Sequence, residues 1–177
     1  MDVPARLLQN LHAVLGAARA AGLAAGAAVI GWLPVGALIL VFSVVFPSDN
    51  PIPFMAGFFY LMVAFPVIGA VASRACTRPW SWPLAGATAG VVMVVLTEAT
   101  YAMVDNVFLG IVSRQPEEIE GFRNSGMTSV RDFINLSLEH QVPGITVLLT
   151  VMGLLMGTIG AICAAEQRHS RPRTGRT

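Results

Sequence analysis

Side chains that could take up a proton or hold a cation lie within a long apolar segment, residues 83–112. No charged residue occurs between Pro83 and Glu98, and Tyr101 and Asp105 follow three and seven residues after Glu98. In a helix these three side chains share one face, and Thr97 flanks it. Because an acidic residue deep in a membrane costs about 2.5–3.5 kcal/mol to insert, this face is a candidate intramembrane polar site.

The acid at position 98 has two interpretations. In a small carrier or channel, the Glu98 carboxyl binds a proton or a cation, and the polar face that continues to Asp105 lines the route. In a structural helix, a protonated Glu98 forms a hydrogen bond to a Thr or Ser hydroxyl across the bundle. Both interpretations require the segment to pack against other helices.

Residues typical of catalysis do not occur in recognisable motifs. The chain has no nucleophile elbow, no HExxH pair and no Gly-rich phosphate loop. Glu98 and Asp105 would lie about 10 Å apart along a helix, which is too far for a carboxylate dyad. Cys76 and Cys163 lack a metal-ligand spacing, and the three histidines are far apart. We therefore expect no enzyme, no cofactor and no metal site.

Composition indicates that lipid is the main solvent of this chain. Hydrophobic residues make up 55% of the 177 residues and charged residues 12%, whereas soluble domains carry about 25% charged residues. All 11 basic residues are Arg, and they are scattered in short groups, with a net charge of +1. This distribution gives no basis for a nucleic-acid partner.

Runs of about 20 apolar residues predict four transmembrane helices. They lie at about residues 22–46, 54–72, 83–112 and 144–165. The predicted fold is an all-α integral membrane protein, in which a four-transmembrane-helix bundle forms one membrane domain, residues 1–166. Pro34 and Pro66 lie inside two of the spans and predict kinks.

Two amphipathic segments accompany the predicted spans. Residues 1–20 have helical apolar spacing and predict an N-terminal amphipathic helix on the membrane surface. A cleaved signal peptide is the competing interpretation, although the apolar run follows the potential cleavage site rather than preceding it.

Residues 113–142 predict a helical extracytoplasmic loop, in which Pro116 begins one helix and Gly126 ends it. A capping box at Ser129–Asp132 then begins an amphipathic helix, residues 129–141, as a lid or a cover over the bundle. Residues 167–177 predict a basic, disordered tail.

Pairs of glycines four residues apart predict where helices approach one another closely. Such small-xxx-small steps let two backbones come into contact in a membrane. The chain has three of them: Gly22 and Gly26, Gly86 and Gly90, and Gly153 and Gly157.

The distribution of arginine predicts the orientation. With four spans, eight of the 11 Arg fall on the side of the termini, and the other side carries Arg114, Arg123 and Arg131 among its acids. The positive-inside rule therefore predicts a multi-pass protein of the cell membrane with cytoplasmic N- and C-termini.

Two hypotheses for the function follow. The first is a structural or accessory membrane component that packs in the lipid bilayer with itself, as a homo-oligomer, or with a larger membrane complex. The alternative is a small carrier or channel that uses Glu98 as a protonatable or cation-binding group.

Overall fold

The structure, a computed structural model, describes residues 3–45, 52–75 and 78–170. These residues form helices and short connections, with no strand among them. The elements are α1 (Val3–Leu40), a π-helical turn η1 (Val41–Val45), α2 (Ile52–Ala72), α3 (Ser81–Val107), α4 (Leu109–Val112), α5 (Pro116–Ser125) and α6 (Val130–Ser170).

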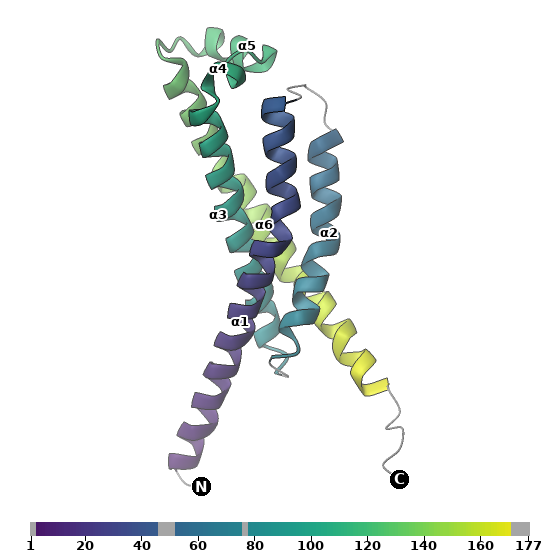
Figure 1. Cartoon of the computed structure of the whole chain (residues 1–177). Helices are drawn as coiled ribbons and strands as arrows, with labels where there is room; N and C mark the ends of the chain where they lie inside the picture. Colours follow the sequence, from purple (N-terminus) through teal and green to yellow (C-terminus); the bar gives the residue numbers. More distant parts are fainter. Residues whose placement is uncertain (1–2, 46–51, 76–77, 171–177) are drawn as a thin grey trace.

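Four of the described helices are long and apolar enough to cross a membrane. They comprise α1 with η1, α2, α3 and α6. These helices run alternately up and down in Figure 1, so that the start of α1, the α2–α3 turn and the end of α6 lie at one end. The short helices α4 and α5 lie at the opposite end. The all-helical class and the four long apolar helices predicted from the sequence are confirmed.

Glycines let α6 pack directly against the backbones of α2 and α3. A Cβ added to Gly86 would overlap the carbonyl of Gly153, and a Cβ on Gly69 would overlap the backbone of Gly157. Further along the same contact, Gly90 faces the backbone of Leu149, and Gly160 faces the backbone of Pro66. We call this contact the glycine seam; its members are Gly69, Gly86, Gly90, Gly153, Gly157 and Gly160.

Alanine, rather than glycine, forms the contact face of α1. Ala17, Ala20, Ala24 and Ala28 recur at helical spacing and are buried. The predicted glycine step on this helix lies elsewhere, because a Cβ on Gly22 or Gly26 would meet nothing within 4 Å. The structure therefore places that step outside every helix contact of the described chain.

Both predicted amphipathic helices are continuous with one of the four long apolar helices. Residues 3–20 belong to α1, and residues 130–141 begin α6, which passes through Pro143 instead of ending before it. Packing against α3 holds this first part of α6: Ile134 is buried beside Val104, and the Asn106 side-chain amide donates to Asn135 Oδ1 at 3.1 Å. One proline removes only one backbone hydrogen bond, and these contacts outweigh that loss.

The end of the third predicted span differs from the structure, whereas the predicted ends of α5 and the predicted cap at Ser129 agree with it. The span predicted at residues 83–112 is divided at Phe108 into α3 and α4. In contrast, α5 begins at Pro116 and ends before Gly126, whose φ of 69° suits glycine. The predicted cap is also present, since the Asp132 N–H donates to Ser129 Oγ at 3.3 Å.

The end of α6 extends into the predicted disordered tail. Residues 167–170 are helical, and the Arg168 guanidinium donates to the Ser73 carbonyl and, at 2.9 Å, to its hydroxyl oxygen. These bonds tie the end of α6 to the end of α2. Residues 171–177 of the predicted tail, and residues 46–51 between the first two spans, lie outside the described residues.

We expect Gly86→Ala to destabilise the fold by about 1–3 kcal/mol, because the added methyl overlaps the Gly153 carbonyl and separates α3 from α6. Thermal or denaturant unfolding in detergent measures this loss. Gly144→Ala in α6 is the matched control, since its Cβ meets nothing within 4 Å. Equal stabilities of the two variants would contradict the close approach of the two backbones at the glycine seam.

Candidate functional site

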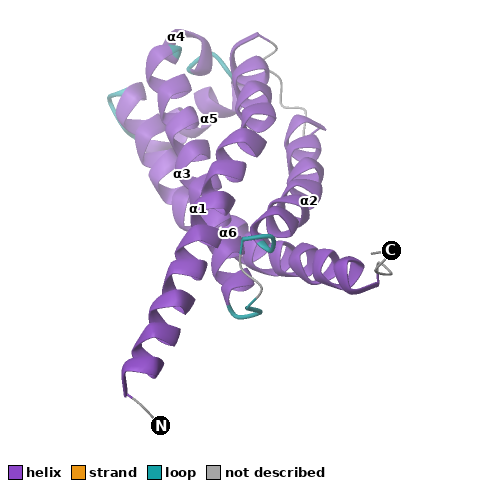
Figure 2. Ribbon diagram, turned by 60° about the horizontal axis from the view of Figure 1, so that its bottom comes forward, coloured by secondary structure: helices purple, strands orange, loops and turns teal. Residues whose placement is uncertain are grey.

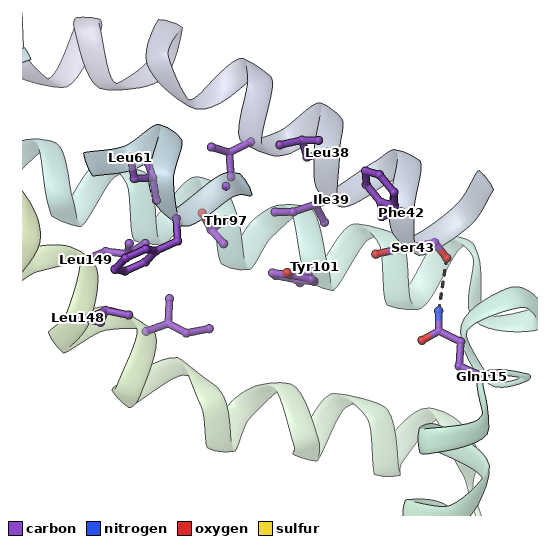
Figure 3. Close-up of a pocket in the computed structure, with 14 residues that line it drawn as sticks. Leu38, Ile39, Phe42, Ser43, Leu61, Thr97, Tyr101, Gln115, Leu148 and Leu149 are labelled. Carbon is purple, nitrogen blue, oxygen red and sulfur yellow. Dashed lines mark hydrogen bonds between the residues drawn. The ribbon is translucent and has the colours of Figure 1, made fainter. Parts of the chain in front are cut away.

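A cavity of about 280 Å³ lies between the long helices, in the half of the bundle that carries α4 and α5. Its lining is mainly aliphatic and aromatic, and we call it the apolar cavity. Figure 3 shows Leu38 and Ile39 of α1, Leu61 of α2 and Leu148 and Leu149 of α6 around this space. Core packing closes the bundle below it, where the glycine seam brings the backbones together.

A second, polar cavity of about 160 Å³ adjoins the first. We call it the acidic chamber, because Asp105 of α3 and Glu118 of α5 both line it. Ser43, Tyr101 and Gln115 belong to both linings, so that these three residues form the junction between the two spaces. Residues of α6 complete the chamber: Ile134, Ser137, Leu138 and Gln141.

The junction joins η1 to the α4–α5 connection. The Gln115 side-chain amide donates to the Ser43 carbonyl oxygen at 3.4 Å, as the dashed line in Figure 3 shows. Ser43 lies in the π-helical turn, a wide turn of a kind that is frequent at functional sites when it occurs within a helix. Gln115 thereby provides a donor for a carbonyl of η1, at the place where the two cavities adjoin.

The acidic chamber has no built-in countercharge. Among the residues that the structure describes, neither lining includes Arg, Lys or His. Burial raises the pKa of the Glu118 carboxyl above its ordinary value, and the neighbouring Glu117 raises it further. The chamber is therefore a place where positive charge would be stabilised.

Three of the four polar residues singled out in the sequence come together here. Thr97 and Tyr101 line the apolar cavity, and Tyr101 and Asp105 line the acidic chamber. Glu98 lines neither. Both of its carboxyl oxygens are shielded from solvent, and neither has a hydrogen-bond partner among the described residues. The hydroxyl of Thr150 is likewise buried without a partner, so the hydrogen bond expected across the bundle is not formed.

Sequence reasoning missed the residues that other elements contribute. Glu118 carried only the signal of an acid in a helix first turn, and Ser43 carried none. Ser137 and Gln141 are four residues apart and share a helix face with Leu138, a pattern that indicated a surface helix. These residues line one chamber because helices that are distant in the sequence pack against one another.

The described residues do not form a metal site of the usual kind: no three His, Cys, Asp or Glu side chains lie close enough together to hold an ion. Comparison with protein-family models, with curated proteins and with solved structures finds no match to this chain.

We expect Glu118→Gln to stabilise the folded protein at about pH 8 and to have little effect at about pH 4. The folded state holds the Glu118 proton more tightly than the unfolded state does. Stability from this group is therefore present at low pH and is lost as pH rises above the ordinary pKa of glutamate. Unfolding temperatures of both proteins across this pH range provide the measurement. A gain that grows toward low pH would contradict the raised pKa of Glu118.

Proposed function

We propose that this chain is a structural or accessory component of the cell membrane that associates with a second copy of itself or with a larger membrane complex. It crosses the bilayer four times, with both termini in the cytoplasm and α4 and α5 outside. The arginine distribution supports this orientation, because cytoplasmic segments are enriched in basic residues. The alternating course of the helices in Figure 1 is consistent with it.

The observation that carries the proposal is the unused glycine step on α1. Gly22 and Gly26 face away from the rest of the described chain, and α1 is the least buried of the four long helices. Figures 1 and 2 show the N-terminal part of α1 projecting away from the other helices. A small-xxx-small step lets another helix approach the backbone closely, which is how helices associate in lipid. The exposed step therefore suits an intermolecular contact.

We expect Gly26→Leu to weaken association about tenfold or more without destabilising the monomer, because its added side chain meets only the partner helix. Energy transfer between labelled copies in liposomes measures self-association, and co-purification in mild detergent detects another subunit. Gly144→Leu is the control, since it adds the same volume at another open position. Unchanged association in both variants would remove the basis for a contact through α1.

A small carrier is the second candidate, and the partnerless carboxyl of Glu98 is the observation that favours it. Ionisable residues within a membrane are costly and often mark ion or proton pathways, and neither carboxyl oxygen of Glu98 has a hydrogen-bond partner among the described residues. The adjoining Thr97, Tyr101 and Asp105 line cavities in the outer half. Transport would require the glycine seam to open, since that contact closes the bundle below them.

If the chain is a carrier, we expect Glu98→Gln to reduce proton- or cation-coupled flux into proteoliposomes about tenfold or more, with unchanged protein content and folding. The matched control is Glu139→Gln, which makes the same change at an exposed position of α6. Flux that Glu98→Gln leaves unaltered would exclude Glu98 as the coupling group.

A further inference from the structure

We propose that the apolar cavity and the acidic chamber together form a binding site for a small amphiphilic organic cation, with an ammonium head in the chamber and one short apolar tail in the cavity. This assignment goes beyond the accessory role. It depends neither on association through α1 nor on transport.

The size and lining of the apolar cavity suit a hydrocarbon tail. A dry cavity of about 150 Å³ lined by Leu, Ile and Phe is known to bind benzene. At the same density, the 280 Å³ of this cavity would accept about eleven carbon atoms. Val35, Leu61 and Leu149, which line it, are buried in the bundle. A tail of this length would make van der Waals contacts with these side chains, which a hydrated ion cannot do.

The charges of the acidic chamber determine the sign of the head group. Asp105 and Glu118 approach it from two helices, and the lining brings no basic residue to pair with them. Both residues are half-buried, and a positive charge beside two carboxylates that are partly removed from water is favourable. A ligand ammonium would supply this charge, whereas an anionic head would add a third negative charge.

The junction residues suit the region between head and tail. Tyr101 belongs to both linings, and its ring can stabilise an ammonium group through its π-face. Gln115 and Ser43 add polar atoms at the same level, and their mutual hydrogen bond holds them in place. The site therefore changes from apolar to polar where an amphiphile does.

The order of the two spaces along the bundle also matches a membrane. The acidic chamber lies at the end of α3 and beneath α5, whereas the apolar cavity lies deeper between the long helices. An amphiphile in a leaflet has the same order, with its charged head at the interface and its tail in hydrocarbon. A ligand could thus keep its orientation on passing from the leaflet into the site. An inorganic cation would leave the apolar cavity unfilled, so the observations favour an organic one.

Binding to the full-length protein in nanodiscs of uncharged lipid tests this assignment. The probes are octyltrimethylammonium, octanol and octyl sulfate, which share one tail and differ in head charge. Titration calorimetry, with empty nanodiscs as the blank for lipid partitioning, measures each affinity. We expect the cation to bind about tenfold or more tighter than octanol, and octyl sulfate to bind weakest.

Variants at each end of the site separate the head from the tail. Asp105→Asn and Glu118→Gln should each weaken the cation about tenfold and leave octanol unaffected, while the exposed Glu120→Gln changes neither. Leu38→Trp should fill the apolar cavity and weaken all three probes, whereas Leu33→Trp, on the exposed face of α1, should not.

The opposite results would overturn the proposal. Equal binding of the three probes, unaffected by Asp105→Asn, would mean that the cavity takes an acyl chain of the surrounding lipid. No saturable binding of the cation would mean that the acidic chamber is not a ligand site. Because Gly26→Leu should bind octyltrimethylammonium as tightly as the native protein does, loss of association and loss of this site are distinguishable.

Discussion

Backbone contact along the glycine seam is the constraint on which the rest of the structure depends. In lipid the hydrophobic effect does not drive helices together, so their association depends on close van der Waals packing. Gly86 against Gly153 and Gly69 against Gly157 provide it, because a side chain at Gly69, Gly86 or Gly153 would overlap a neighbouring backbone and one at Gly157 would be tightly confined. The seam fixes where α6 crosses α2 and α3.

The two cavities lie beyond that crossing, on the side of α4 and α5. In the half that carries α4 and α5, larger side chains lie between the helices, and Phe58, Leu61 and Tyr101 are among those that line the apolar cavity. Two hydrogen bonds between segments distant in sequence join the elements at this end: Gln115 to Ser43, and Asn106 to Asn135. The bundle is therefore densely packed at the glycine seam and more open beside α4 and α5.

Much of the fold could be predicted from the sequence, because long charge-free runs and caps are local signals. The spans, the ends of α5 and the cap at Ser129 depend on residues close in the chain. Which glycine step is buried could not be predicted, since Gly22 and Gly26 have the same spacing as Gly86 and Gly90. Pro143 was predicted to lie beyond the end of a helix, but contacts of α6 with α3 keep that helix continuous.

The candidate site was only partly predictable for the same reason. Thr97, Tyr101 and Asp105 follow one helix face, and a periodic pattern identifies such a face. Glu118, Ser43 and Gln141 reach the acidic chamber from three other elements, and no spacing in the sequence relates them. Glu98, the most conspicuous polar residue of the sequence, lies outside both linings.

Because α6 is continuous, it reaches from one end of the bundle to the other (Figure 1). Its 41 residues extend about 60 Å, twice the hydrocarbon thickness of a bilayer, and the glycine seam lies between its two ends. One arm lines the acidic chamber, and the other ends at the bond between Arg168 and Ser73. One continuous helix therefore both lines the acidic chamber and closes the contact with the end of α2 at the opposite end of the bundle.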